Sequence, residues 1–336
     1  MSGVRQQALL WLILSGVGAG FATLPAQAAS GLDISIPVPP QTTRIEQDLV
    51  SGHAADALAR IGGLLQNNPN DALALELRCR VQIEEQQWSA AVDSCEAAVK
   101  NAPNSSETHF WLGRAYGELA QRSGRISAFL LARKLHVQLE QALALDPSNL
   151  DAYDALGAFY VEAPEVIGGG LKKARALEAK LAQVNASHAH ALAAQIAESE
   201  KNYPQAEQQW KAAISSSQEP ALAWIDLASY YQRRGDIPAM LKAVFTGVTL
   251  DKSHGLAQVR GAELLMASGQ NFPQAARWFS EYLASGQKSE EAPVFVVHAE
   301  LAQLLEKMGD HAQADEQLAL AKDLAPEYRA KDTSGA

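Results

Sequence analysis

Cysteine, basic charge and long apolar runs are scarce in this sequence. Its 336 residues include 2 cysteines, 28 lysines and arginines, and 38 aspartates and glutamates. The acidic balance disfavours nucleic-acid binding, because the phosphate backbone requires clustered lysine and arginine. The apolar run from Ala8 to Ala22 has about 15 residues, fewer than the ~20 that a membrane-spanning helix needs. We therefore expect no transmembrane segment in the mature chain.

Signatures of enzymes and metal sites are also missing. The chain has no Gly-x-Ser-x-Gly, His-Glu-x-x-His or Cys-x-x-Cys-His motif, which serve esterases, zinc proteases and haem attachment. His188 and His190 are two residues apart, so on a helix they point in different directions. We predict a non-enzymatic protein with no metal and no cofactor; the remaining enzymatic alternative is an unrecognised constellation such as Glu162, Glu165 and Lys172.

The N-terminal region has the pattern of a secretory signal. Arg5 precedes the apolar run, and Leu24-Pro25-Ala26-Gln27-Ala28 supplies the small-x-small pattern that signal peptidase requires. We predict a signal peptide over 1–28, cleavage after Ala28 and export to the periplasm. An uncleaved anchor is the alternative, but the run is short and contains three glycines.

Small and apolar residues recur before successive prolines, two of which, Pro69 and Pro103, are 34 residues apart. The residues 12, 8 and 5 places before a proline are Ala57, Ile61 and Leu64; Ala91, Cys95 and Ala98; Leu135, Leu139 and Ala142; and Ala314, Leu318 and Ala321. Spacings of four and three place each set on one helical stripe. A period near 34 residues predicts a stacked array of helix pairs.

Eight helical pairs account for residues 41–328. Their predicted starts lie near residues 41, 72, 106, 150, 189, 221, 255 and 295. Residues 29–41, which include three prolines, are predicted to form an extended leader, and residues 329–336 a mobile tail. The side chain that should pack on the following unit is apolar in seven units and is Lys322 in the eighth. A polar residue there predicts that the array ends with this unit.

The first helices carry a second pattern of leucine, a small residue and an aromatic or apolar residue. Its members are Leu112, Gly113 and Tyr116; Leu156, Gly157 and Tyr160; Leu227, Ala228 and Tyr231; and Leu301, Ala302 and Leu305. The pattern resembles the tetratricopeptide-repeat (TPR) family, in which a Trp-x-x-Leu-Gly-x-x-Tyr helix precedes an Ala-x-x-x-Phe-x-x-Ala helix and a proline. The second unit departs from it at Arg78 and Gln82. The resemblance implies an all-α fold, a right-handed α-solenoid of about eight helix-turn-helix repeats.

Two units have insertions. About ten extra residues between Glu118 and Phe129 predict that both helices of the third unit run on by about five residues, and this hairpin could support self-association. In the fourth unit, Gly168, Gly169 and Gly170 precede a helix that begins with Leu171, Lys172 and Lys173. Free amides and two ammonium groups could bind a phosphate or carboxylate there, and a flexible turn is the alternative.

The two cysteines, Cys79 and Cys95, fall on facing sides of two helices in one unit. Export to an oxidising compartment favours a disulfide. Packed helix axes, however, lie about 8 to 10 Å apart, and a disulfide needs Cα atoms within about 7 Å. A bridge and a pair of buried free thiols both remain open.

The family resemblance implies that the first helices line a concave groove. The groove residues it predicts are Glu76, Arg80, Ile83, Phe110, Arg114, Asp154, Leu222, Ile225, Val259 and Met266. The early part mixes acids with arginines, whereas the later part is largely apolar, although some of its residues could pack against neighbouring helices instead. The Lys and Asn residues with which chaperone-binding members hold a C-terminal carboxylate are missing.

These features predict a protein-protein interaction scaffold of the bacterial envelope. A segment of a protein partner would lie in the groove, with apolar residues supplying affinity and Arg80 and Arg114 orienting a carboxylate. The alternative is a small-molecule or glycan carrier in an envelope assembly or export system. Among the predicted groove residues, only Phe110 offers the aromatic surface that sugars stack on.

Overall fold

The computed structural model describes residues 40–328, and helices make up nearly all of their secondary structure. The helices are α1 Pro40–Val50, α2 Ala54–Asn67, α3 Ala72–Glu84, α4 Trp88–Asn101, α5 Ser106–Gln121, α6 Arg125–Leu145, α7 Leu150–Glu162, η1 (3-10) Glu165–Ile167, α8 Leu171–Leu181, α9 Ala186–Ser199, α10 Tyr203–Ser216, α11 Pro220–Arg234, α12 Ile237–Leu250, α13 Leu256–Ala267, α14 Phe272–Ala284, α15 Val294–Met308 and α16 His311–Leu324. The predicted signal peptide, residues 29–39 of the predicted leader, and the predicted tail lie outside the described residues.

Consecutive helices pack as eight hairpins, α1 with α2 through to α15 with α16. Each odd-numbered helix also packs on the hairpin before it, so the hairpins form one continuous stack. The single β feature within residues 40–328 is an isolated bridge between Ser289 and Ala292. The chain is therefore an all-α solenoid of TPR-like hairpins.

Side-chain caps mark the point at which several first helices begin. Asp71, Ser105, Asn149 and Asn185 each accept a hydrogen bond from the backbone N–H three residues further on. Such a cap satisfies an amide that the helix leaves unpaired and contributes about 1 kcal/mol. These caps explain why α3, α5, α7 and α9 begin where they do.

The repeated stripe of small and apolar residues lies between the helices. Ile61, Cys95 and Leu139 are at most 1% exposed. Leu318, the equivalent residue on α16, is 40% exposed. Glycine permits the closest approaches: a Cβ at Gly157 would lie 2.9 Å from a methyl of Leu192 on α9.

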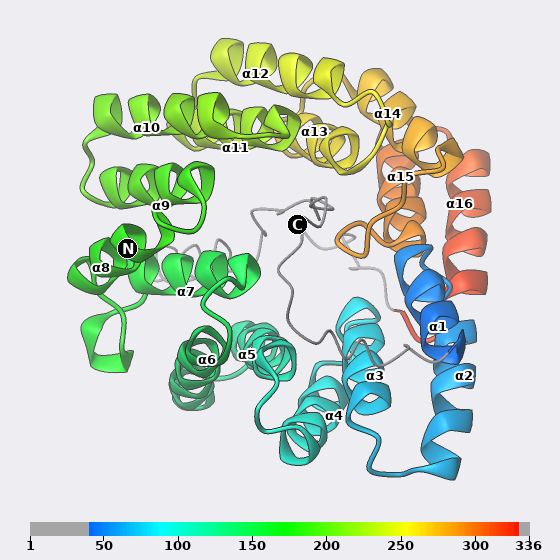
Figure 1. Cartoon of the computed structure of the whole chain (residues 1–336). Coiled ribbons are helices and arrows are strands. Elements are labelled where there is room, and N and C mark those ends of the chain that lie inside the picture. Colours follow the sequence, from blue (N-terminus) through cyan, green and yellow to red (C-terminus); the bar gives the residue numbers. More distant parts are fainter. Residues whose placement is uncertain (1–39, 329–336) are drawn as a thin grey trace, which may run out of the picture.

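The stack closes on itself (Figure 1), which the sequence did not indicate. Ile45 and Leu49 of α1 share one buried core with Phe295 and Ala299 of α15. Within the C-terminal end, the Phe295 ring also contacts that of Tyr328, which follows α16, with centroids 5.0 Å apart. The last described hairpin, α15 and α16, is covered by the first, so the described residues form a ring.

Gly52 allows the two ends to meet. This residue lies in the turn between α1 and α2 and has a φ of +73°. A Cβ at Gly52 would be 2.5 Å from the backbone nitrogen of Val294, the first residue of α15. Glycine is therefore required both for the backbone conformation and for the close contact across the closure.

The third hairpin is longer than its neighbours. Its helices have 16 and 21 residues, compared with 13 and 14 in the second hairpin. The outer face of α6 exposes Ile126, Leu130 and Val137 to solvent by 55 to 80%. Among residues 40–328, no helix is long and apolar enough to cross a membrane.

A disulfide joins Cys79 of α3 to Cys95 of α4. Their Cα atoms are 5.4 Å apart, within the range that a disulfide spans, because facing Cα atoms of two packed helices lie closer together than the helix axes do. The structure thus contains the bridge rather than two free thiols.

Candidate functional site

The inner face of the ring surrounds a cavity of about 1320 Å³. The first helices α1, α3, α5, α7, α9, α11 and α13 all contribute side chains to it. Residues 285–293, which join α14 to α15 and which we call the closure loop, reach it through Gln287 to Glu291. Figure 1 shows this loop on the inner side of the ring. The cavity is the candidate site.

The predicted groove residues divide into two groups. Those that line the cavity are Glu76, Arg80, Phe110, Arg114, Asp154 and Leu222. Ile83, Ile225 and Val259 are at most 5% exposed and lie in the hydrophobic cores. Met266 is partly buried against the same core as Val259.

Of the predicted apolar part of the groove, Leu222 lines the cavity, whereas Ile225 and Val259 do not. Ile225 and Val259 pack between neighbouring helices, because burial there removes their apolar surface from water. The residues that α11 and α13 present to the cavity include Asp226, Arg233 and Arg260. Isolated charges within apolar helical sequences, such as Asp226 and Arg260, were the signal that could have identified them.

Acidic residues outnumber basic residues in the cavity wall. The acidic residues are Glu46, Glu76, Glu107, Asp151, Asp154, Glu162, Glu198, Glu219, Asp226, Asp251, Glu290 and Glu291. Only five basic residues, Arg80, Arg114, Arg233, Arg260 and Lys288, accompany these twelve acids. Walls of low dielectric around such a charge excess concentrate its field within the cavity.

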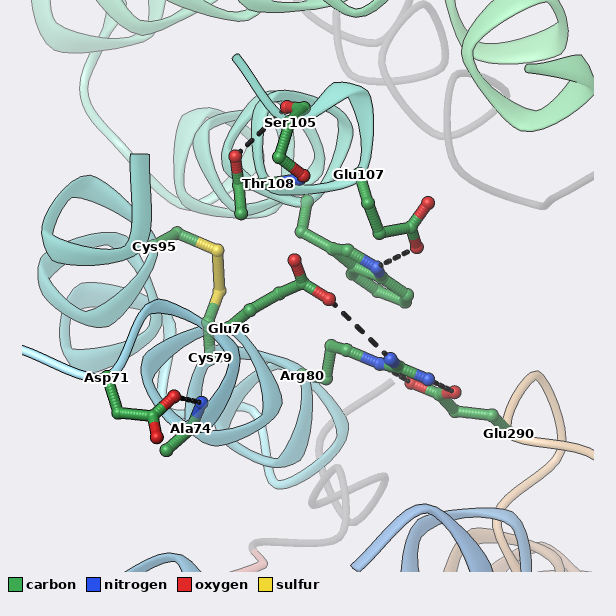
Figure 2. A network of polar contacts seen from close by, with 11 residues as sticks. Asp71, Ala74, Glu76, Cys79, Arg80, Cys95, Ser105, Glu107, Thr108 and Glu290 are labelled. Carbon is green, nitrogen blue, oxygen red and sulfur yellow. Dashed lines mark hydrogen bonds and ion pairs between the residues drawn. A yellow bond between two sulfur atoms is a disulfide. The ribbon is translucent and has the colours of Figure 1, made fainter. Parts of the chain in front are cut away.

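Arg80 connects the two ends of the ring (Figure 2). Its Nε donates a hydrogen bond of 2.9 Å to Oε1 of Glu290 in the closure loop, and its Nη2 lies 2.5 Å from Oε2 of the same residue. Glu76 adds an ion pair at 3.7 Å. Burial and the repulsion of Glu107 raise the pKa of Glu76 to about 7. Arg80 is occupied by these groups, so the predicted role of orienting a partner carboxylate is wrong for this residue.

The closure loop is held in place by its own contacts. Lys288 Nζ donates to the carbonyl oxygens of Tyr282 and Ser285 at 2.7 and 2.5 Å, which caps the end of α14. The hydroxyl of Tyr282 donates to the carbonyl of Ala292 at 2.7 Å and accepts from the backbone N–H of Ser289 at 3.0 Å. The loop therefore presents Glu290 to Arg80 from a fixed position.

Arg114 differs from the other basic residues of the cavity. Its guanidinium lies 4.9 Å from the centre of the Trp111 ring, a cation–π distance. Trp111 in turn donates a 2.6 Å hydrogen bond to Glu107. Within residues 40–328, Arg114 makes no hydrogen bond or close ion pair, so its donors face the cavity unoccupied.

Arg233 and Arg260 are already paired. Arg233 donates two hydrogen bonds to Glu198, at 2.8 and 3.0 Å. Arg260 lies 3.2 Å from a carboxylate oxygen of Glu263 and 3.7 Å from one of Glu291. These pairs neutralise only part of the acidic wall.

Burial shifts the ionisation of several cavity carboxyl groups. It raises the pKa of Glu162 from an ordinary 4.5 to about 8. Burial and the nearby Asp154 raise the pKa of Asp226 to about 7 and that of Asp151 to about 6, both from 3.8. These acids lose water on entering the folded chain, and the charges of Arg233 and Arg114 nearby offset that loss only in part, which disfavours their charged form.

Asp154 is the acid of this group that has a direct partner. Nδ1 of His188 lies 2.8 and 3.0 Å from its two carboxylate oxygens. Burial raises the pKa of Asp154. Burial lowers the pKa of His188, but the hydrogen bond and the charge of Asp154 outweigh it, so the net shift is upward.

The predicted anion site at the triple glycine is wrong. The backbone N–H groups of Gly168, Gly169 and Gly170 donate to the carbonyls of Glu165, Pro164 and Tyr160 at 2.8 to 3.2 Å. No amide of the three is left for a ligand. Lys173, which was expected to bind the same anion, donates a 2.8 Å hydrogen bond to the carbonyl of Gly168 instead, and the neighbouring Lys172 is exposed on α8. The segment is a closed turn.

No protein-family model and no curated protein matches the chain. Among solved structures it is similar to a thermophilic TPR protein of Thermus thermophilus, at 19% identity over 56% of this chain and 96% of the other, with a TM-score of 0.47. A tetratricopeptide repeat protein from Parabacteroides merdae has 16% identity over 79% and 97%, with a TM-score of 0.47. YrrB, a TPR protein with an unusual peptide-binding site, has 14% identity over 62% and 97%, with a TM-score of 0.36. These likenesses concern the helical-repeat fold and assign no residue of the cavity.

Proposed function

We propose that this chain is a non-enzymatic scaffold of the bacterial envelope that holds a segment of a partner protein inside its ring. The observation that carries the proposal is the cavity of about 1320 Å³ that the first helices enclose. Ligand sites for small molecules span about 300 to 1,000 Å³, so this cavity has room for a larger, extended ligand.

The composition of the wall also favours a polypeptide. Apolar residues such as Ala155, Ala158, Leu222 and Ala257 alternate with charged ones along it. An extended polypeptide segment also carries both apolar and charged side chains along its length, so it could contact both kinds of wall residue. The predicted signal peptide and the disulfide between Cys79 and Cys95 support an oxidising, extracytoplasmic compartment.

Site-specific photo-crosslinking tests the proposal. A photoreactive amino acid at Leu222, which lines the cavity, should crosslink to a defined partner in the envelope fraction of the native host. The matched control places it at Leu320, which is 41% exposed on α16 and outside the cavity. Equal crosslinking from both positions, or none from Leu222, would contradict the proposal.

A small-molecule or glycan carrier is the second candidate function. Phe110, Trp111 and Trp210 line the cavity together, which supplies more aromatic surface than the sequence indicated. Aromatic faces next to polar groups favour sugar stacking. Native mass spectrometry of the chain purified from its own cells separates the two: a discrete added mass of a sugar or metabolite supports the carrier.

A further inference from the structure

The positive charges of the cavity wall are largely used up within the fold. Arg80 is held by Glu290 and Glu76, and Arg233 by Glu198. Lys288 is bound to backbone carbonyl oxygens. Arg114 is the basic residue of the wall that stays without a hydrogen bond or close ion pair to another described residue. The acidic residues of the wall still outnumber the basic ones, so the pairing leaves an excess of carboxylates facing the cavity.

Three of those carboxylates have no partner. Asp151, Glu162 and Asp226 line the cavity, and none of them makes a hydrogen bond or ion pair with another described residue. Oε2 of Glu162 is buried as well as unpaired. A buried polar atom without a partner destabilises the folded chain, so an arriving donor would relieve a penalty that the folded chain already carries.

We infer that the cavity accepts cationic side chains, the lysines and arginines of an extended partner segment, with Asp151, Glu162 and Asp226 as their acceptors. The inference rests on the proposed function and specifies its ligand. Ammonium and guanidinium groups provide several donors each, and their hydrogen bonds to carboxylates are about twice as strong as neutral ones.

The neighbouring residues fit the same ligand. The indole ring of Trp210 lies in the wall, and aromatic faces attract cations that have lost part of their water. In the described part of the chain, no group of three or more acidic, histidine or cysteine side chains is placed to hold a metal ion. The acids are distributed along the wall, which suits several separate positive groups on one chain.

Calorimetric titration with synthetic peptides tests the inference. The purified chain is titrated with octalysine, octaglutamate and an uncharged Gly-Ser octamer at about pH 8.5, where carboxyl groups with pKa values near 7 to 8 are largely ionised. Octalysine should bind, and its affinity should fall as sodium chloride rises from about 0.05 to 0.5 M. The other two peptides should bind at least about tenfold more weakly.

Matched substitutions locate the binding. Asp226→Asn and Glu162→Gln should each weaken octalysine binding by about three- to tenfold. The controls Asp315→Asn and Glu316→Gln remove the same charges from exposed positions of α16. They should change the affinity for octalysine by less than about twofold. Because burial raises the pKa of both cavity acids, their neutral replacements should fold, which thermal unfolding can check.

The outcomes separate the inference from the function it rests on. Preferential binding of the acidic or uncharged octamer, sensitive to the cavity substitutions, would overturn the inference and leave the segment-binding function standing. Absence of binding by all three peptides would overturn both. Equal effects of the cavity and α16 substitutions would place octalysine on the outer surface and overturn the inference. Spermine serves as a further probe: if it binds as tightly as octalysine, the ligand would be a polyamine, which also overturns the inference.

Discussion

Arg80 illustrates how single residues control the charge balance of this ring. Its guanidinium faces Glu290 from the closure loop and Glu76 from its own helix. Glu84 lies near the same group: both of its oxygens are buried without a hydrogen bond, and burial raises its pKa while Arg80 opposes the shift. Without Arg80, three acids at the closure would lose their shared counter-charge.

We therefore predict that Arg80→Ala lowers the free energy of unfolding by about 3 to 5 kcal/mol, as breaking a buried pair does. The control, Arg60→Ala, removes a 43% exposed arginine 2.7 Å from Asp48, and surface pairs contribute only about 0 to 1 kcal/mol. Urea denaturation at neutral pH measures both. Similar losses for the two variants would show that the closure does not depend on Arg80.

The buried carboxyl groups also predict how stability depends on pH. Burial raises the pKa of Glu162 to about 8, and those of Glu76, Glu85 and Asp226 to about 7. Between the ordinary and the raised values the folded chain binds more protons than the unfolded chain, so the free energy of unfolding falls as pH rises through this interval.

Two buried histidines act in the opposite direction. Burial lowers the pKa of His136 and of His298, so their contribution to stability grows as pH rises through their ordinary range. The carboxyl groups are more numerous and their shifts are larger. Calorimetric Tm should therefore be higher near pH 5 than near pH 8, and Glu162→Gln should flatten the slope. A Tm that rises over this interval would contradict the prediction.

At the level of elements, the turn between α1 and α2 determines whether the ends can meet. Gly52 and Gly235 have nearly the same backbone conformation, with φ of +73° and +72°. A Cβ at Gly52 would strike the backbone of Val294, whereas a Cβ at Gly235 would have no neighbour within 4 Å. Comparing substitutions at these two glycines therefore distinguishes the effect of backbone strain from the effect of the contact between Gly52 and Val294.

Gly52→Ala should accordingly open the closure, and Gly235→Ala should not. Both substitutions add the cost of a left-handed alanine, about 1 kcal/mol, but only the first displaces α15 from α1. Small-angle scattering should report a larger radius of gyration for Gly52→Ala alone. Unchanged scattering of that variant, or expansion of both, would count against a ring held by this contact.

The disulfide stabilises the second hairpin next to the closure. Cys79 and Cys95 are 16 residues apart, and a loop of about 15 residues corresponds to about 3 kcal/mol in the chain-entropy description. In urea denaturation, the free energy of unfolding of the double variant Cys79→Ala with Cys95→Ala should be lower by up to that amount. A reductant should lower the stability of the native chain and leave the double variant unaffected; a chain insensitive to reductant would refute the contribution.

For the whole molecule, closure changes how the repeats cooperate. An open solenoid loses structure first at its ends, because terminal repeats have one neighbour instead of two. In this ring the first and last hairpins cover each other through a shared core. The first and last hairpins therefore support each other through this core, although their helices touch less extensively than those of successive hairpins do.

Hydrogen exchange should reveal this mutual support of the two ends. Backbone amides of α1 and α15 are expected to exchange about as slowly as those of α7, within about tenfold. In Gly52→Ala, exchange should accelerate at α1 and α15 and remain slow at α7. Fast exchange at the ends of the unsubstituted chain would indicate an open array.

The sequence by itself determined the helix pairs, because small and apolar residues at helical spacing, such as Ile61 and Cys95, can be buried only against a partner helix. It also identified six residues of the cavity wall through their place in the repeat. It did not distinguish Val259, which is buried in the core, from Asp226, which lines the cavity. Both lie on first helices, and only the packing of those helices decides which side chain faces the cavity.

The ring and its acidic cavity were decided by tertiary structure alone. Closure depends on the sum of small rotations between successive hairpins, which no local spacing encodes. The pairing of Arg80 with Glu290, 210 residues apart, follows from that sum. The same closure brings acids from α7 and α11 around one cavity, and their burial there, not their order along the chain, raises their pKa values.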